Sequence, residues 1–226
     1  MSLTLYLHPL ASFCHKVLIA LYESNTAFTA QTVDLGDPAS ARQVLDRWPV
    51  GKIPVLQDTA TNRVIPETSI IIEYLVNHYP GSQPMIPKDP EESLQVRLWD
   101  RFFDQYVSVP MQKIVTDRIR PAGATDPHGV ADARSTLRTA YAMIDGQLAA
   151  DIWATGPTFT MADCAAAPAL FFATIVEPPP PEYVALSAYF ERLLARPSVQ
   201  RTLADARPYF SMFPYRDAMP HRFLAD

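Results

Sequence analysis

Glycine and cysteine are scarce in this chain, and their scarcity excludes several kinds of site. Its 226 residues include seven glycines, scattered so that neither a dinucleotide-binding fingerprint nor a phosphate-cradling loop can be written. The two cysteines, Cys14 and Cys164, lie far apart, which indicates neither a disulfide framework nor a zinc-type cysteine pair. The five histidines show no spacing typical of metal ligands. We therefore expect no metal site and no tightly bound organic cofactor.

Long apolar runs and blocks of basic charge are also missing. No stretch approaches the roughly 20 uncharged apolar residues that a membrane-spanning helix needs, and the first residues lack the basic-then-apolar pattern of a secretory signal. The net charge is −5, with acidic and basic residues interspersed, which is unlike the charge pattern of a nucleic-acid binder. These absences predict a cytoplasmic location and neither nucleic acid nor membrane as a partner.

The chain does have enough apolar material for one or two packed domains, since 48% of its residues are hydrophobic and 19% are charged. Before residue 80, strand-like runs with a period of two alternate with helical runs. The predicted strands lie at residues 3–7, within 28–33, at 54–58 and at 63–66. The element order β-α-β-α-β-β-α predicts an α+β domain in which helices pack on a mixed sheet.

Two helices of this first domain each show one apolar face at helical spacing. These faces consist of Cys14, Val17, Leu18 and Leu21 in the first helix, and of Ile70, Ile71, Tyr74 and Leu75 in the third. We expect both faces to be buried.

The second half of the chain shows helical patterns only. A proline-rich connector at residues 81–90 precedes it, so we divide the chain into domains at 1–80 and 91–226, the second of them all-α. The tail from residue 207 to 226 is rich in aromatic residues and proline, which is unlike a disordered terminus. We expect this tail to fold back onto the helical domain.

The first helix of the second domain is predicted to be long and amphipathic. Its apolar positions include Leu94, Leu98, Phe102 and Val109. Pro110 should kink or end this helix, because proline lacks the N–H that a helix interior requires.

Ser12 is the first candidate for a chemical role. It stands where the first helix should begin, off the apolar face of that helix. A helix N-terminus offers unpaired N–H groups and a partial positive charge, both of which favour a thiolate placed there. A serine hydroxyl aimed at the sulfur would add a hydrogen bond to the charged form. The same serine could instead be an ordinary N-cap.

Cys14 and Tyr6 are the alternatives to Ser12. Cys14 lies near the helix start beside His15 and Lys16, where a thiol can be acidified into a nucleophile. Its place on the apolar face favours a small buried side chain instead. Tyr6, on the strand face opposite the leucines, could donate to a thiolate, although a buried strand tyrosine is the commoner case.

The order of the motifs across nearly the whole chain resembles the glutathione transferases. These motifs are Leu3–Leu7, 9–14, 51–55, Glu67-Thr68-Ser69 and, in the helical half, Thr160 with Asp163. The last pair can form a reciprocal capping box, so we assign it to folding. The resemblance implies a thioredoxin-like N-terminal domain followed by an all-helical C-terminal domain.

The resemblance also implies a glutathione site. In this family the residue before a cis-proline presents its backbone to the cysteinyl part of glutathione, and a following acid and hydroxyl bind the γ-glutamyl end. Ile53, Pro54, Glu67 and Thr68 match those positions. Lys52 matches a residue that in many members approaches the glycyl carboxylate.

One departure from the related folds concerns the start of the first helix. Ala11 occupies the first place of the thioredoxin Cys-x-x-Cys, which excludes dithiol exchange through that pair. Counted from Pro9, Ser12 matches the position at which the bacterial beta class carries its cysteine. Ser12 is therefore our candidate for the contact with the glutathione sulfur.

The second substrate should lie beside the sulfur in a mostly apolar pocket between the domains. Its candidate lining residues are Phe103, Tyr106, Val107 and Met111. We expect a glutathione transferase that lets the thiolate attack a small apolar electrophile, as in detoxification, with glutathione as a substrate. The alternatives are a glutathione-dependent peroxidase or thiol transferase using Cys14, and a non-catalytic protein that binds glutathione or apolar ligands. The family commonly forms two-fold dimers, so we expect a homodimer.

Overall fold

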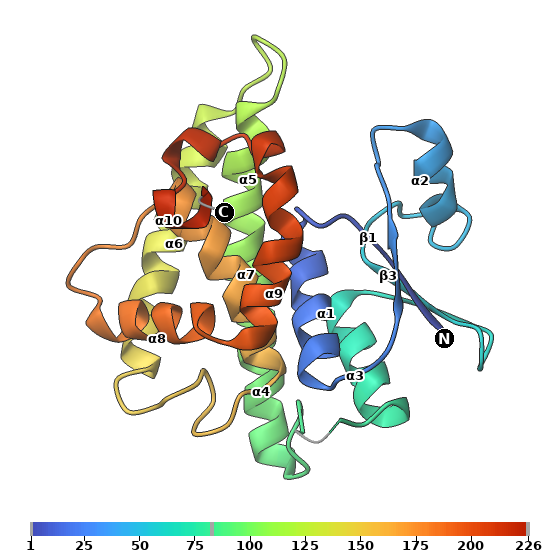
Figure 1. Cartoon of the computed structure of the whole chain (residues 1–226). Helices are drawn as coiled ribbons and strands as arrows, with labels where there is room; N and C mark the ends of the chain where they lie inside the picture. Colours follow the sequence, from blue (N-terminus) through green and yellow to red (C-terminus); the bar gives the residue numbers. More distant parts are fainter. Residues whose placement is uncertain (1, 82–83, 225–226) are drawn as a thin grey trace.

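The N-terminal half contains one four-stranded mixed sheet with helices on both faces (Figure 1). The computed structural model describes residues 2–81 and 84–224, so part of the predicted connector at 81–90 lies outside the described residues. The strands are β1 (Leu3–Leu7), β2 (Thr29–Thr32), β3 (Val55–Asp58) and β4 (Arg63–Pro66), in the spatial order β2-β1-β3-β4. β1 runs parallel to β2 and antiparallel to β3, and β3 runs antiparallel to β4. The predicted element order is confirmed.

The two faces of this sheet pack against different helices, which are α1 (Ser12–Glu23), α2 (Pro38–Leu45) and α3 (Thr68–His78). The leucines of β1 share a buried cluster with α1 and α3. Tyr6 points the opposite way and packs with Val44 of α2. In Figure 1, α1 and α3 lie between the sheet and the helical half, and α2 covers the outer face.

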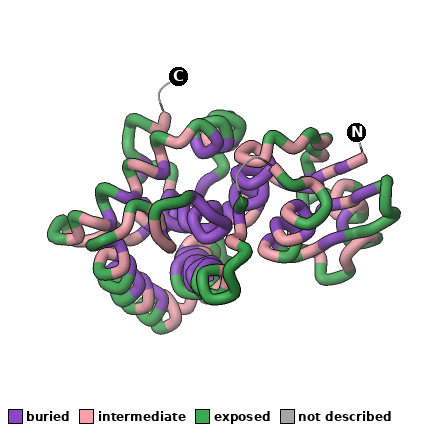
Figure 2. The backbone as a smooth tube through the Cα atoms, turned by 90° about the horizontal axis from the view of Figure 1, so that it is seen from below, coloured by how far each residue is buried: buried purple, intermediate pink, exposed green. Residues whose placement is uncertain are grey.

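All the secondary-structure elements named in the described part of the C-terminal half are helices, joined by loops. Its elements are α4 (Pro90–Phe102), η1 (Phe103–Ser108), α5 (Val109–Arg118), α6 (Pro127–Gln147), α7 (Met161–Val176), α8 (Val184–Leu194), α9 (Pro197–Ala206), η2 (Arg207–Met212), η3 (Arg216–Ala218) and α10 (His221–Leu224). Buried residues gather in the middle of the molecule and exposed ones at its rim (Figure 2). Fifteen of the sixteen residues of α7 are buried, so this helix forms the centre of the domain. No described helix is both long enough and apolar enough to span a membrane.

Two predicted faces are wrong in part. Leu94 and Leu98 of α4 are 57% and 56% exposed, and the buried face of this helix carries Val96 and Trp99 instead. Ile70 of α3 is 55% exposed, although its three predicted partners are buried as expected. Because α4 has apolar residues on two faces, the periodicity of the sequence alone could not identify the one that meets the core.

Pro110 neither ends nor sharply interrupts the helical path. The stretch before it, η1, is a π-helix, and α5 continues from Val109 with Pro110 near its start. A widened turn accommodates a residue that has no N–H to donate to the preceding turn. The change of helical period also rotates the residues that follow, which affects the site described below.

Two local predictions for the helical domain are confirmed. Asp163 Oδ2 accepts a hydrogen bond from the Thr160 N–H at 2.8 Å, and both halves of the capping box at the start of α7 are formed. The tail folds back, since Phe210 stacks on Phe171 with 5.9 Å between ring centroids and Phe223 contacts the same ring edge-on.

A buried cluster of charges joins the two halves. Lys16 of α1 is 1% exposed, and its Nζ lies 2.6 Å from Asp100 Oδ1 and 2.8 Å from Asp104 Oδ2. The same Nζ donates to Ser69 Oγ at 3.0 Å, and Ser69 donates to Asp100 Oδ2 at 2.5 Å. Arg101 adds a partly exposed cation 3.1 Å from Asp104. α1, the start of α3, and the α4–η1 segment are therefore tied to one ammonium group.

Replacing Lys16 by methionine should destabilise the fold strongly. The variant would leave two neighbouring carboxylates buried without their shared cation, and breaking a buried ion pair in this way costs about 3–5 kcal/mol. Urea unfolding of wild type and Lys16→Met measures the loss.

Lys113→Met is the matched control for this measurement. Lys113 pairs with Asp126, but the two side chains are 31% and 40% exposed, so solvent screens the pair and the loss should be much smaller than in Lys16→Met. Equal losses in the two variants would contradict the role given to Lys16.

Candidate functional site

The candidate site lies where the two halves meet, at two adjoining depressions of about 180 Å³ and 440 Å³. The smaller depression is lined by residues from both halves of the chain, and the larger one mainly by the segments around β1, α1 and residue 52. Four side chains, Phe13, Lys52, Ile53 and Gln112, line both depressions and so connect them.

All five residues that the sequence singled out for glutathione line the smaller depression. They are Lys52, Ile53, Pro54, Glu67 and Thr68. The peptide bond between Ile53 and Pro54 is cis, as the resemblance implied. The opposite wall comes from the helical domain and consists of Arg101, Asp104, Gln105, Val109 and Gln112. These side chains, separated by many residues in sequence, meet only because the domains pack as described above.

The start of α3 supplies a second polar feature of the smaller depression. Glu67 is exposed and adopts φ 66° and ψ 122°, a backbone conformation that non-glycine residues rarely occupy. Thr68 follows as the first residue of the helix, so the N–H groups of its first turn face no earlier helical carbonyl. Such a helix end favours a carboxylate, while the Glu67 side chain is available to a cationic amino group.

Ser12 is the first residue of α1 and not its N-cap. The N-cap is Ala11, and no side chain caps this helix. Ser12 is 6% exposed, and its Oγ accepts a long hydrogen bond of 3.4 Å from Gln112 Nε2. An acceptor role toward Gln112 leaves the hydroxyl hydrogen available to a further partner. Ser12 itself lines neither depression, but it contacts Gln112, one of the four residues that connect them.

Cys14 and Tyr6 do not reach the site. Cys14 is fully buried, and this burial raises the pKa of its thiol to about 12, so the thiolate that a nucleophile requires is disfavoured. Tyr6 is 7% exposed, and its hydroxyl donates to Gln57 Oε1 at 3.1 Å on the sheet face covered by α2. Neither residue lines a depression, so these positions do not support a contact of Cys14 or Tyr6 with the sulfur.

None of the four residues predicted to line the co-substrate pocket lines either depression. Phe103, Val107 and Met111 are 1%, 0% and 3% exposed and belong to the core of the helical domain. The fourth, Tyr106, is 55% exposed and packs on Phe102 instead of lining either depression. The π-helical turn of η1 changes which residues of this segment face the N-terminal domain, and a regular helical period does not reveal this.

The sequence analysis did not identify several residues that line the two depressions. His8 and Leu10 line the larger depression from the segment between β1 and α1, Phe13 does so from the first turn of α1, and Gln112 from α5. Asp104 lines the smaller one, and burial, opposed by Lys16, raises the pKa of its carboxyl. The sequence contains one signal for Asp104. Asp100 and Asp104 are four positions apart and therefore share one helical face. Two such carboxylates, when buried, require a cation beside them.

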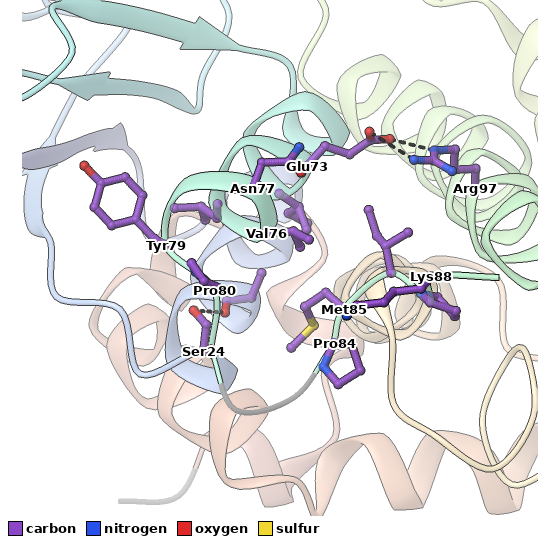
Figure 3. A pocket seen from close by; sticks show the side chains of 16 residues that line it. Ser24, Glu73, Val76, Asn77, Tyr79, Pro80, Pro84, Met85, Lys88 and Arg97 are labelled. Carbon is purple, nitrogen blue, oxygen red and sulfur yellow. Dashed lines mark hydrogen bonds and ion pairs between the residues drawn. The ribbon is translucent and has the colours of Figure 1, made fainter. Parts of the chain in front are cut away.

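Another cavity, of about 590 Å³, lies away from these two depressions. It is enclosed by α3, the connector before α4 and the end of α1, with Glu73 and Arg97 paired at 2.8 Å on one side (Figure 3). None of the residues predicted to bind glutathione lines it. Among the described residues, no group of three or more histidine, cysteine or acidic side chains is placed to hold a metal ion.

Two family models match the chain. Residues 5–83 match the glutathione S-transferase N-terminal domain, and residues 127–192 match the glutathione S-transferase C-terminal domain. Together they cover more than half of the chain, and each falls in the corresponding half of the observed fold.

Curated relatives show similarity along most of the chain. "FtsZ-localized protein A" of Caulobacter vibrioides is 28% identical over 216 residues, which is 91% of this chain and 92% of that protein. Glutathione S-transferase GstB of Escherichia coli is 24% identical over 159 residues, covering 69% of this chain and 74% of that protein.

Solved glutathione transferases share the fold. The enzyme from Methylobacillus flagellatus, solved with glutathione bound, has a TM-score of 0.81 and 24% identity, covering 89% of this chain and 98% of that one. The enzyme from Methylobacterium radiotolerans, in complex with glutathione sulfonate, has a TM-score of 0.78 and 26% identity, covering 88% and 93%.

Both cysteines should be unreactive in the native protein. Cys14 and Cys164 are fully buried, and burial raises both thiol pKa values. A chromogenic disulfide reagent should therefore label neither thiol in the folded state and both in denaturant, where their ordinary reactivity returns. Rapid labelling of Cys14 in the native protein would contradict its assignment to the core.

Stability should fall as the pH is lowered from neutral toward 4, in part because of His15. Burial lowers the pKa of this histidine from 6.5 to about 4, against the opposing effect of its hydrogen bond with the Pro9 carbonyl. The unfolded state therefore binds a proton below pH 6.5 that the folded state refuses, which removes about 2 kcal/mol between pH 7 and pH 5.

His15→Gln tests this assignment by urea unfolding at the two pH values. Glutamine retains an N–H for the Pro9 carbonyl but does not titrate, so the variant should lose less stability over this interval than the wild type. An identical pH dependence would show that other groups cause the loss.

Proposed function

The chain belongs to the glutathione S-transferase family, and we propose that it binds glutathione in the smaller depression and activates its thiol for attack on an apolar electrophile. The observation that carries this proposal is the convergence of all five predicted glutathione residues on one depression between the domains. Members of the family use glutathione as a substrate, and two similar structures contain glutathione or its sulfonate.

The polar groups of the smaller depression match the ends of the tripeptide. The N-terminus of α3 at Thr68 suits the γ-glutamyl carboxylate, and the Glu67 side chain suits the neighbouring ammonium group. The backbone of Ile53, fixed before Pro54, suits the cysteinyl unit, and Lys52 suits the glycyl carboxylate. Each charged group of glutathione thus finds a partner of opposite sign.

Activation of the thiol follows from the start of α1. The helix has no side-chain cap, so its first N–H groups and its positive end favour a thiolate. A Ser12 hydroxyl that donates to the sulfur stabilises the charged form further, since the bond from Gln112 uses an acceptor position on Oγ. Ser12 is therefore the residue that we assign to the sulfur, in preference to Cys14 and Tyr6.

The larger depression suits the electrophile. Most of its lining is apolar, and it adjoins the expected position of the sulfur through Phe13, Ile53 and Gln112. Such a conjugation reaction would serve detoxification, and we assign it to the cytoplasm. Exposed apolar side chains on β4, α3 and α4, namely Val64, Ile70, Leu94 and Leu98, support a homodimer.

The ultraviolet difference spectrum of the protein titrated with glutathione near neutral pH tests the proposal. A thiolate band should saturate in the wild type. In Ser12→Ala the pKa of the bound thiol should rise by about one unit or more, because one hydrogen bond to a charged group is lost. The band at neutral pH should therefore weaken several-fold.

Cys14→Ala is the control in the same titration. It should retain the band, because its side chain belongs to the core and not to the site. Turnover lost in Cys14→Ala and kept in Ser12→Ala would favour the peroxidase or thiol transferase mechanism. No saturable binding of glutathione by the wild type would overturn the proposed function.

A second candidate function is binding without turnover. It is favoured by the relative named FtsZ-localized protein A, whose match covers 91% of this chain although its name describes no transferase. Saturable glutathione binding with no conjugation over a broad panel of electrophiles would support this second function over the first.

A further inference from the structure

His8 lines the larger depression, and two contacts fix its ring. It follows β1 directly, in the short segment that leads to α1. Its Nδ1 accepts a hydrogen bond of 3.2 Å from the N–H of Leu10, and the Tyr209 ring packs against it in a T-shaped arrangement with 5.0 Å between centroids. A side chain held by a hydrogen bond and by a ring contact has a defined orientation relative to the depression.

The hydrogen bond at Nδ1 determines which nitrogen can act on a ligand. Because Nδ1 accepts a hydrogen bond from the Leu10 N–H, the neutral ring carries its own hydrogen on Nε2. Partial burial lowers the pKa of His8, although nearby Asp34 opposes this effect, so the neutral form prevails at neutral pH. Nε2 has no hydrogen-bond partner among residues 2–81 and 84–224. The ring therefore offers one unused donor.

The Nε2–H donor of His8 lies in mostly apolar surroundings. Apolar side chains supply most of the lining of the larger depression, and the other polar side chains there are Lys52 and Gln112. Both of these also line the smaller depression, where Lys52 suits the glycyl carboxylate and Gln112 bonds Ser12. His8 alone of the three lines only the larger depression, on the side where the electrophile would bind.

We propose that His8 donates a hydrogen bond from Nε2 to the oxygen of an α,β-unsaturated carbonyl co-substrate, and so makes such compounds the preferred electrophiles of this site. This inference rests on the proposed glutathione transferase function and adds the substrate class. The motivating observation is a fixed donor in an apolar depression, which suits an electrophile with one acceptor atom on an apolar body.

The chemistry of addition explains why this donor matters for rate. The glutathione thiolate forms a carbon–sulfur bond at the β-carbon, and the electron pair of the carbon–carbon double bond moves toward the carbonyl oxygen. Negative charge grows on that oxygen in the transition state, where the Nε2–H bond strengthens. The α-carbon then takes a proton from water, equal to the one released when the thiol ionised. An alkyl halide puts its charge on a departing halide and gains nothing from a donor aimed at a carbonyl.

Two aryl electrophiles test the proposal, trans-4-phenyl-3-buten-2-one as the enone and benzyl chloride as the halide. In His8→Phe, which keeps a ring for Tyr209, kcat/KM for the enone should fall about 10- to 100-fold, the effect of losing one hydrogen bond to a group that becomes charged. The value for benzyl chloride should stay within about 3-fold. His8→Gln retains an N–H and should recover part of the enone rate.

His128→Gln is the matched control, because this histidine is exposed on α6 and does not line either depression. Calorimetric binding of glutathione should be unchanged in every variant. Equal losses for both electrophiles, or no loss for the enone, would overturn the role of His8. Wild-type binding of glutathione without turnover of the enone would overturn the proposal alone, whereas absence of glutathione binding would overturn the proposed function itself.

Discussion

The ion cluster around Lys16 is the interaction on which the rest of the site depends. A lysine 1% exposed to solvent requires nearby anions, and both Asp100 and Asp104 come from the other half of the chain. Ser69, bonded to the same ammonium group, immediately follows Thr68 at the start of α3. The cluster therefore fixes the α3 N-terminus against the helical domain. Asp104 is at once a member of the cluster and a wall of the smaller depression, so the packing of the domains and the shape of the site are set together.

Two helix starts converge on this junction, and neither has a side-chain cap. The α3 start has an acidic residue beside it in an uncommon backbone conformation, and the α1 start has Ser12 beside Gln112. Uncapped N–H groups in a depression favour anions, and a tripeptide with two carboxylates and an ionisable thiol offers three of them. The larger depression, mostly apolar with His8 on its wall, suits the uncharged partner of such a thiol. The polarity of each lining therefore suits the smaller depression to glutathione and the larger one to the electrophile.

Most of the fold could be predicted because its signals are local. The period-two leucines of β1, the Thr160–Asp163 capping box and the apolar face of α1 each specify their own structure, and all are observed. The glutathione residues were found because short motifs keep their order along the chain. The co-substrate residues were not, because the π-helical turn of η1 alters the helical period at Phe103 and Val107 and so changes the direction of Met111, which follows in α5. The sequence did not identify the role of Lys16, since its two carboxylate partners lie more than eighty positions further along the chain.

A crystal structure of the protein with reduced glutathione tests the central claim most directly. The account predicts the γ-glutamyl end at Thr68 and Glu67, the cysteinyl backbone at Ile53, and the sulfur within hydrogen-bond distance of Ser12 Oγ, with both ion pairs of Lys16 intact. Glutathione bound elsewhere, for example in the cavity beside Glu73 and Arg97, or bound between the domains with its sulfur turned away from the α1 N-terminus, would contradict it.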